Sequence, residues 1–396
     1  MKEMAAWIAV GALALVVYSY AIYPLVLAVW AAWRQLGRDL AYLRNKADRR
    51  QCTPATWPPV AVVIAAYNEE QHIAARVANL LAQDYPADKL HIYVGSDGSR
   101  DRTAEILRGI TDPRLHAHIV DHNRGKAAML NDLRERVQES IVVFSDANTY
   151  FDSQALKQLV RWFEDPAVGG VSGELRLLDS AGHNQDSLYW RIEQALKFFE
   201  GRIGGLLGAN GAIYAIRRSL WPALRPDTIV DDFCIGMAVP VAGRKLVYDP
   251  SAWAQEDTPD DLQEEYHRRL RIGVGNFQAL FRHPEYLTRT SWATRFAYLS
   301  HKVIRWITPH LALLALLLSL GLALSTQAPA WALFTALQFV AYGLTGLLYW
   351  HSTRGGHVPG VMRLPAFFFA LNWAFLKSSW RYARGGHKGS WRRTAR

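Results

Sequence analysis

The chain contains very little cysteine. Only Cys52 and Cys234 occur among its 396 residues. Two cysteines exclude a disulfide framework and a cysteine-based metal site, and their scarcity indicates a reducing compartment. The histidines, including His183, lack the two-histidine spacing of a helical metal site, so we assign them no metal. Internal repeats and low-complexity tracts are also missing, which excludes a repeat architecture.

Charge is absent from Met4–Trp33. This stretch is long enough to span a bilayer with some tilt. It is longer than a signal-peptide core and lacks a small-residue cleavage site, so we expect residues 1–33 to form a retained transmembrane helix. We expect residues 34–59 to form a basic linker, whose charge places it in the cytoplasm. Its basic residues up to Arg50 are Arg34, Arg38, Arg44, Lys46, Arg49 and Arg50.

The composition is basic and apolar, with a formal net charge of +10, 50% hydrophobic residues and 15 tryptophans. A basic chain can bind nucleic acid. Here, however, the charge clusters at Arg34–Arg50 and Arg381–Arg396, beside apolar segments, which favours anionic lipid headgroups. The tryptophans suggest anchors at the membrane interface. We therefore expect membrane lipids, and no nucleic acid, among the partners.

The C-terminal third is apolar again. Trp306–Leu324 and Ala330–Trp350 each suit a spanning helix, which gives two expected spans within residues 306–350. Leu364–Leu376 is shorter, and a span there would put the basic tail outside, against the positive-inside tendency. We expect residues 351–396 to form an interfacial or re-entrant helix and a basic cytoplasmic tail. A fourth span is the alternative.

Short β-branched runs alternate with helical stretches over residues 60–276. The expected strands are Val60–Ala65, Ile92–Gly95, Ala117–Val120 and Ile141–Phe144. The expected helices are Asn68–Leu81, Asp101–Arg108, Lys126–Glu135 and Ser153–Glu164. This alternation predicts an α/β domain with a mostly parallel sheet that is covered on both faces. Residues 277–305 are expected to form an amphipathic interface segment.

The strand Ile141–Phe144 leads into an acid and an amide, Asp146 and Asn148. Ligands of open α/β sheets bind beyond the carboxyl ends of the strands. Carboxylate and amide oxygens are ligands that Mg²⁺ or Mn²⁺ prefers. An ordinary polar turn is the alternative. Two further acidic positions, Asp97 and the pair Asp231-Asp232, favour the metal site.

Three loops carry further polar motifs. In Ala65–Glu70, Asn68 is expected to cap a helix whose free N–H groups attract anions, although a plain cap is the alternative. In Gly95–Thr103, Asp97 is placed to accept from a base or ribose, and Asp101 or Ser99 caps the next helix. The segment from Asn123 supplies a glycine turn and then Lys126 near a helix start. It is not a P-loop, because the second glycine and the Ser/Thr of that motif are missing.

Tyr-Asn-Glu, Ser-Asp-Gly-Ser-x-Asp-x-Thr, Gly-Lys, Asp-Ala-Asn and Asp-Asp follow one another in the order and approximate spacing of family 2 glycosyltransferases. The chain resembles membrane-embedded members related to the synthases of hyaluronan, cellulose and poly-N-acetylglucosamine. The resemblance covers about Val60 to Asn276, and the flanking helices more loosely. It implies a cytoplasmic GT-A domain over residues 60–276 that uses a UDP-sugar and Mg²⁺ or Mn²⁺.

The resemblance also implies residue roles. Asp146 faces the metal on the diphosphate, and Asn148 stands where many relatives have a second aspartate. Asp232 acts as the general base, which must lie within hydrogen-bond reach of the acceptor hydroxyl, and Asp231 supports it. The alternative is that Asp231 caps a helix and Asp232 is solvated. The implied donor-binding residues are Ala66, Asn68, Glu69, Asp97 at the uracil, Lys126 and Asp146.

Arg268 and Arg271 are three apart, hence on one helical face, and can clamp a diphosphate leaving group. They resemble the family's Gln/Arg-x-x-Arg-Trp motif, with Ile272 in place of the tryptophan. A basic amphipathic helix on the membrane surface is the alternative. Asn210 and Gly211 resemble a family loop near the acceptor, and a turn without ligand contact is equally consistent.

The sequence therefore predicts an inverting glycosyltransferase, a multi-pass protein of the bacterial inner membrane, that moves a sugar from a UDP-sugar to a growing polysaccharide in β-linkage. Single-sugar transfer to a lipid-linked acceptor or glycolipid is one alternative. A non-catalytic nucleotide-binding membrane subunit is another. The sugar, the acceptor, processivity and any secretion partners stay open.

Overall fold

The computed structural model describes residues 1–45, 54, 56–178, 188–257, 262–354 and 359–385. The middle of the expected basic linker, His183 and the end of the expected tail lie outside these ranges. The chain divides into two compact units. The helical unit contains Met1–Val29, Asp261–Phe281 and Tyr298–Gly386, and the sheet unit contains Trp30–Asp260 and Arg282–Ala297.

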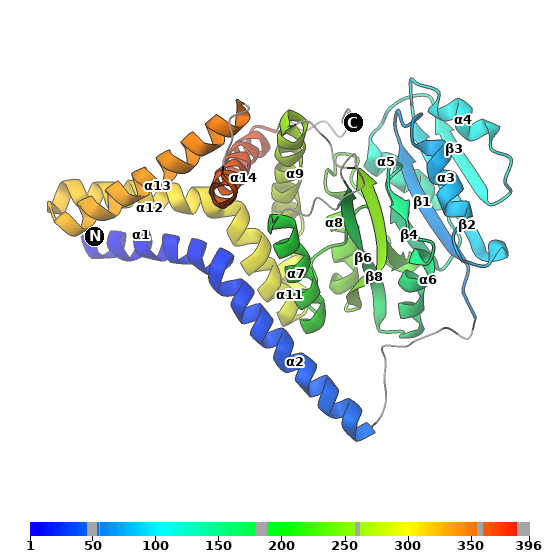
Figure 1. The fold of residues 1–396 in the computed structure, drawn as a ribbon, viewed down its shortest axis with the longest axis horizontal. Helices are drawn as coiled ribbons and strands as arrows, with labels where there is room; N and C mark the ends of the chain where they lie inside the picture. The colour runs from blue at the N-terminus through cyan, green and yellow to red at the C-terminus, as the bar shows by residue number, and fades with distance from the viewer. Residues whose placement is uncertain (46–53, 55, 179–187, 258–261, 355–358, 386–396) are drawn as a thin grey trace. The chain divides into compact units, whose positions relative to one another are not determined.

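The sheet unit is built on an eight-stranded sheet in the order β3-β2-β1-β4-β7-β6-β8-β5 (Figure 1). Its strands are β1 (Val60–Ala66), β2 (Leu90–Asp97), β3 (Leu115–Val120), β4 (Ile141–Ser145), β5 (Tyr150–Phe151), β6 (Val168–Leu178), β7 (Tyr214–Arg217) and β8 (Lys245–Asp257). The four expected strands are present. The α/β class is confirmed, but the sheet is mixed, because β7 pairs antiparallel with β4 and β6, and β5 pairs antiparallel with β8.

The central parallel strands β1, β2 and β4 are buried on both faces. Every residue of β1 is buried, as the continuous run of apolar residues predicts. Val62 and its alternate neighbours pack in one core with Val77 of α3 (Ile73–Leu81). The opposite face packs on α5 (Lys126–Arg136), where a Cβ at Gly95 would lie 2.1 Å from the sulfur of Met129. This close packing fixes the start of α5 against the ends of β1 and β2.

Three of the four expected helices begin later than the sequence suggests, whereas α5 begins at Lys126 as expected. The helix expected from Asn68 begins at Ile73, and the one expected from Asp101 begins at Thr103. The stretch expected from Ser153 is helix α6 followed by a 3-10 turn. The remaining elements are α4 (Thr103–Gly109), α6 (Ala155–Val160), α7 (Leu188–Ile203), α8 (Asp231–Val241), α10 (Glu285–Thr288), α11 (Trp292–Ala297) and 3-10 turns at Ala87–Lys89, Arg161–Glu164 and Arg218–Leu220.

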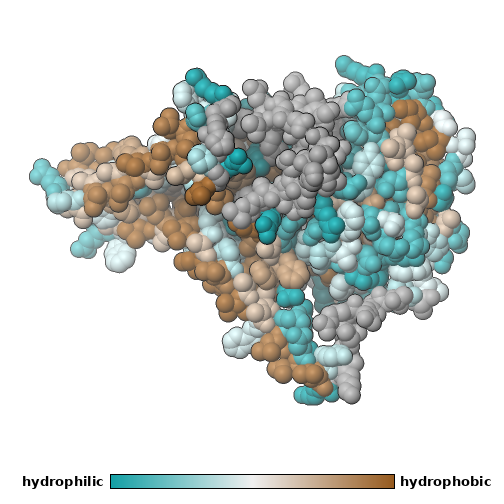
Figure 2. Space-filling model, viewed as in Figure 1, coloured by the Kyte–Doolittle hydropathy of each residue, from teal (hydrophilic) through white to brown (hydrophobic). Residues whose placement is uncertain are grey.

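The helical unit is formed by long helices, most of them apolar. They are α1 (Lys2–Val17), the first part of α2 (Tyr23–Asn45), α9 (Leu262–Arg282), α12 (Ile304–Thr326), α13 (Pro329–Thr353) and α14 (Gly360–Ala383), with π-turns at Tyr18–Ile22 and Tyr298–Val303. Hydrophobic residues cover much of the visible surface of α12 and α13 (Figure 2).

Three helical runs of the described chain are long and apolar enough to cross a membrane: Lys2–Arg44, Trp292–Thr326 and Pro329–Thr353. They contain the three expected spans, which indicates a membrane protein. The expected Leu364–Leu376 segment lies in α14, which is not among these three runs.

The two π-turns of the helical unit hold each other through polar groups. The Ser19 hydroxyl donates to the carbonyl of Ser300 at 2.7 Å, and the hydroxyls of Tyr18 and Ser300 lie 2.9 Å apart. A π-turn loosens the backbone hydrogen bonding of a helix, and the Ser19 hydroxyl satisfies one carbonyl there. These bonds join α1 and α12 at their ends.

Candidate functional site

The loops after β1 and β2 are joined by paired hydrogen bonds. The amide of Asn68 donates to the hydroxyl of Ser99 at 3.1 Å, and Oδ1 of Asn68 accepts the amide of Arg100 at 2.8 Å. The amide of Glu69 donates to the hydroxyl of Thr103 at 2.8 Å. Ala66, the buried last residue of β1, leads into the first of these two loops. These hydrogen bonds therefore hold the loops after β1 and β2 together at the edge of the sheet.

Asn68 does not cap a helix, and that expectation is wrong. Its φ of 57° is left-handed, a conformation that asparagine tolerates better than most residues. The helix starts only at Ile73, because the Asn68 side chain is bound to the neighbouring loop. At α4, the carboxylate of Asp101 accepts the amide of Thr103 at 3.0 Å, but the N-cap residue is Arg102, so neither Asp101 nor Ser99 is the expected cap.

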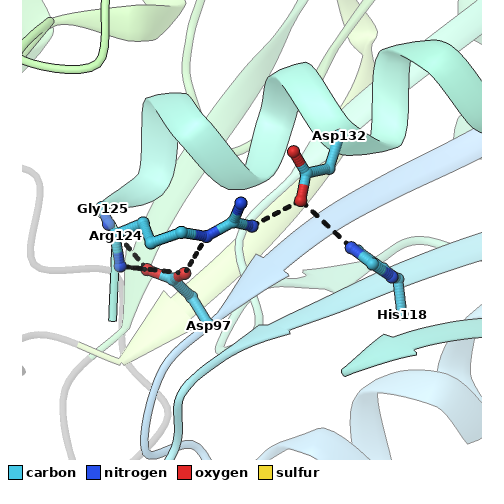
Figure 3. A network of polar contacts seen from close by, with 5 residues as sticks. All are labelled: Asp97, His118, Arg124, Gly125 and Asp132. Atoms are coloured by element: carbon cyan, nitrogen blue, oxygen red, sulfur yellow. Dashed lines mark hydrogen bonds and ion pairs between the residues drawn. The ribbon is translucent and has the colours of Figure 1, made fainter. Parts of the chain in front are cut away.

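Asp97 holds the loop that leads into α5 (Figure 3). Its side chain is fully buried, and its oxygens accept the amides of Arg124, at 3.0 and 3.1 Å, and Gly125, at 2.7 Å. Burial raises the pKa of Asp97, against the opposing effect of these amides. Arg124 in turn pairs with Asp132, whose carboxylate also contacts His118 at 3.1 Å. Asp97 thus fixes the residues directly before Lys126, while its expected contact with uracil stays a prediction.

Lys126 gathers the carboxylates of the site. Its Nζ lies 2.8 Å from Oδ1 of Asp146, at the end of β4, and 3.4 Å from Oδ2 of Asp231, at the start of α8. Burial lowers the pKa of Lys126, but Asp146 and Asp231 outweigh that effect and the net shift is upward. The ammonium therefore stays charged and links two elements that are far apart in the sequence.

Asp232 lies beside this cluster and against a glycine. A Cβ at Gly211 would lie 2.8 Å from Oδ2 of Asp232, so a side chain at this position would displace the carboxylate. Oδ1 of Asp232 accepts the amide of Phe233 at 2.8 Å. Burial, and then the charge of Asp231, raise the pKa of Asp232 to about 6. A carboxylate with this pKa is ionised at neutral pH and is a better proton acceptor than an ordinary aspartate.

The acceptor-loop residues lie in the same part of the sheet unit. The amide of Asn210 donates to the hydroxyl of Ser172 at 2.9 Å, and its carbonyl accepts the amide of Ile213 at 2.9 Å. These bonds form a tight turn around Gly211. The structure thus brings the predicted loop to the predicted base, Asp232.

The donor atoms at the end of β4 suit a cation shared with a diphosphate. The Asp146 side chain is 36% exposed, so its carboxylate is accessible. The Asn148 amide donates to the buried Glu256 at 3.0 Å, which leaves its carbonyl oxygen as the ligand atom. Among the described residues no group of three His, Cys, Asp or Glu side chains is placed to hold an ion. Mg²⁺ commonly takes one or two carboxylates and completes its shell with substrate phosphates, so these residues fit that type of ion.

The predicted arginines lie on α9 of the helical unit. Arg268 is half-buried and Arg271 is exposed, three residues apart on the helix. The helix packs on α14, where the Ser378 hydroxyl donates to the carbonyl of Leu270 at 3.0 Å. Arg269, which lies between them, stacks on the ring of Phe367 with its guanidinium 4.6 Å from the centroid. Their role at a diphosphate stays a prediction.

Sequence patterns missed three residues around the site. Glu256 orients Asn148 from β8, a strand that the sequence did not predict. Arg76 and Ser145 lie beneath the end of β4 and bond to each other at 2.8 Å. Arg76 falls in an expected helix with no motif around it, so no local signal marks it. Ser145 is adjacent to Asp146, and that position was its only signal.

The site thus combines a mixed α/β sheet with carboxylates held beside a lysine at its edge. A model described as "Glycosyltransferase like family 2" matches residues 58–275, more than half of the chain. The chain belongs to this family of glycosyltransferases.

Several relatives share this domain. A poly-beta-1,6-N-acetyl-D-glucosamine synthase of Staphylococcus aureus (strain COL) is 24% identical over 275 residues, which are 66% of this chain and 65% of the relative. An N-acetylglucosaminyltransferase of Rhizobium sp. (strain N33) is 26% identical over 244 residues, 56% of this chain and 53% of the relative. The chain thus aligns with less than two thirds of either relative.

A solved structure has the same fold. The mannosyltransferase PcManGT from Pyrobaculum calidifontis, in complex with GDP-Man and Mn²⁺, superposes with a TM-score of 0.70. The superposition covers 96% of this chain and 99% of that chain, at 20% sequence identity. This likeness establishes the GT-A fold of the sheet unit.

Proposed function

We propose that the chain is an inverting hexosyltransferase that moves a sugar from a UDP-sugar to a growing polysaccharide, in β-linkage. The observation that carries the proposal is the ammonium of Lys126 between Asp146 and Asp231, directly beside Asp232. This arrangement combines a base with a charged surface for a diphosphate in one site. The relative named as a poly-beta-1,6-N-acetyl-D-glucosamine synthase supports a polysaccharide product.

In the proposed reaction, Asp232 takes the proton of an acceptor hydroxyl. The hydroxyl oxygen forms a bond to the anomeric carbon while the bond from that carbon to the diphosphate breaks, and UDP leaves with the electron pair. Attack opposite the leaving group inverts the anomeric centre. The pKa of Asp232, raised to about 6, suits a base that works at neutral pH.

Asp146 and the carbonyl oxygen of Asn148 would hold Mg²⁺ or Mn²⁺, which neutralises charge on a departing diphosphate. Lys126 supplies a second positive charge at the same place. Arg268 and Arg271 are proposed to contact the diphosphate as well, since guanidinium groups bind phosphate in a bidentate manner. Ala66, Asn68, Glu69 and Asp97 are proposed to surround the nucleotide.

The proposed location is the bacterial inner membrane, with the sheet unit in the cytoplasm. Three helical runs of membrane-spanning length support it, and the basic residues after the first run favour the cytoplasmic side. Nucleotide sugars would then reach the site directly. Membrane lipids are the proposed surroundings of the helical unit.

The proposal is tested by incubating the purified full-length protein with UDP-glucose, UDP-N-acetylglucosamine, UDP-glucuronate and GDP-mannose, each with Mg²⁺ or Mn²⁺. We expect release of UDP from one UDP-sugar and a product of polymer length on a sizing column. Product of one added sugar on a lipid would support transfer to a lipid-linked acceptor. Nucleotide binding without turnover would support a non-catalytic subunit.

A further inference from the structure

Arg76 is a buried cation that the proposed chemistry does not use. Its side chain has no exposed surface, and burial lowers its pKa although the charges of Tyr150 and Asp146 oppose that effect. Its Nη1 donates to Oδ1 of Asn79 at 2.6 Å, and its Nη2 donates to the hydroxyl of Ser145 at 2.8 Å. The guanidinium lies 4.2 Å from the ring centroid of Phe151. Burying a cation whose hydrogen-bond partners, Asn79 and Ser145, are both neutral costs folding free energy, which suggests that Arg76 serves the site.

The hydrogen bond from Arg76 to Ser145 is followed by a second one, from Ser145 to a backbone carbonyl. A guanidinium can only donate, so the Ser145 hydroxyl accepts from Arg76 and directs its own proton elsewhere. It donates that proton to the buried carbonyl of Ala212 at 2.8 Å. The relay Arg76–Ser145–Ala212 therefore joins α3, the end of β4 and the loop before β7.

The end of this relay lies next to the proposed base. Ala212 follows Gly211, and a Cβ at Gly211 would lie 2.8 Å from Oδ2 of Asp232. Asn210, one residue earlier, is the proposed acceptor contact. A shift of the Ala212 carbonyl would therefore move Gly211 against the carboxylate that must reach the acceptor.

We propose that Arg76 is a positioning residue, which through Ser145 holds the Asn210–Ala212 loop in register with Asp232. The inference rests on the proposed role of Asp232 as the base. The contact itself, however, is open to measurement without any turnover. Misplacing a reacting group by about 1 Å can cost about 10²-fold in rate, so a small loop shift has a large effect.

The chain offers a matched control in Arg217 on β7. Its guanidinium donates two hydrogen bonds as well, here to the backbone carbonyls of Val168 and Phe163 at 2.8 Å each, and it lies over the ring of Phe163. Arg217 pairs with Ile141 at the start of β4, whereas Ser145 ends that strand. Arg217→Met thus removes a comparable structural arginine that lies beside the start of β4, whereas Arg76 contacts the end of β4.

The experiment compares Arg76→Met, Arg76→Lys, Ser145→Ala and Arg217→Met in the full-length protein. Hydrogen exchange of the amides of residues 209–213 is followed by mass spectrometry, and turnover is measured with the active UDP-sugar. In Arg76→Met and Ser145→Ala we expect exchange in this loop to quicken by about tenfold, the equivalent of one lost hydrogen bond to a charged or buried group. We expect turnover to fall by about 10²-fold with the donor KM within about twofold.

Arg76→Lys keeps a donor and a charge, so it should recover most of both losses. Arg217→Met should leave exchange in residues 209–213 unchanged, even where it lowers the melting temperature. Folded Arg76→Met with wild-type exchange in this loop would overturn the proposal, and so would a loss that Arg217→Met matches. A wild-type protein that transfers no sugar would contradict the proposed function instead, and the exchange data would still decide the relay.

Discussion

The ammonium of Lys126 lies 2.8 Å from a carboxylate oxygen of Asp146. The two residues come from different elements, the first turn of α5 and the end of β4. Asp97 fixes the backbone of Arg124 and Gly125, immediately before Lys126. The buried carboxylate of Asp97 therefore positions Lys126 through the residues that precede it. The Lys126 ammonium also lies 3.4 Å from Oδ2 of Asp231.

Replacing Lys126 with methionine should shift the pH dependence of turnover. Lys126 lowers the pKa of Asp232, which burial and Asp231 raise to about 6. Without the ammonium this pKa rises further, and the base becomes protonated at a higher pH. The acid limb of the kcat profile, expected near pH 6 in the wild type, should move to higher pH. A profile that keeps its acid limb in place would show that Lys126 does not act on Asp232.

Asp146→Ala should abolish divalent-dependent turnover, because the site at the end of β4 has a single carboxylate of its own beside Asn148. Asn148→Asp adds a second carboxylate and should retain activity while tightening the binding of Mn²⁺, measured by calorimetry. It also repels Glu256, so protein yield serves as a control. Sugar transfer that continues at full rate in EDTA would contradict the metal assignment.

Asp97→Asn should weaken donor binding through the loop that carries Lys126. An asparagine amide turns a donor toward the amides of Arg124 and Gly125, which lose an acceptor while buried. We expect the donor KM to rise by about tenfold or more, and exchange of the Arg124 and Gly125 amides to quicken. If the donor KM rises while these amides keep wild-type protection, a direct contact of Asp97 with the uracil of the donor is the better explanation.

The topology is tested with a cysteine added after Arg396. Both basic clusters favour the cytoplasmic side, so an impermeant thiol reagent should label this cysteine only after the membrane is opened. A cysteine placed before Met4 should react from outside in the same cells. Labelling of the C-terminal cysteine from outside would show that the Leu364–Leu376 segment spans the membrane.

The sequence predicted the parallel half of the sheet well. β1 and β4 are fully buried on both faces, so apolar runs mark them without help from tertiary structure. The second half of the sheet was not predicted, because β6 and β8 are long and irregular strands whose pairing contains register shifts. β5 is only two residues long. Irregular pairing between strands that are far apart in the sequence leaves little local trace.

The sequence predicted which residues gather at the site, but not the hydrogen bonds that hold them. Asp231, Asp232, Lys126 and Asp146 do gather, which spaced motifs anticipate because strand ends share one sheet edge. Asn68 was misread, because a left-handed residue bound to the next loop has the same sequence signature as a helix cap. Arg76 carried no signal, since Ser145 and Phe151, which it contacts, are far away in the sequence and come near it only once the chain is folded.

The most direct test of the account is Asp232→Asn. The change preserves volume, and it should not destabilise the protein. The folded pKa is raised, so ionisation of Asp232 opposes folding at pH 7, and a neutral amide removes that effect. The melting temperature at pH 7 should therefore equal or exceed that of the wild type. Asp231→Asn serves as the matched neighbour and should do less harm.

General-base catalysis commonly contributes about 10²–10⁴-fold. We predict that turnover of Asp232→Asn falls by at least about 10²-fold while its affinity for UDP stays near wild type, because the proposed nucleotide contacts lie elsewhere. Turnover and UDP affinity are measured on one preparation of the folded variant. A folded Asp232→Asn protein that transfers sugar at near the wild-type rate would contradict the assignment of the base and the mechanism built on it.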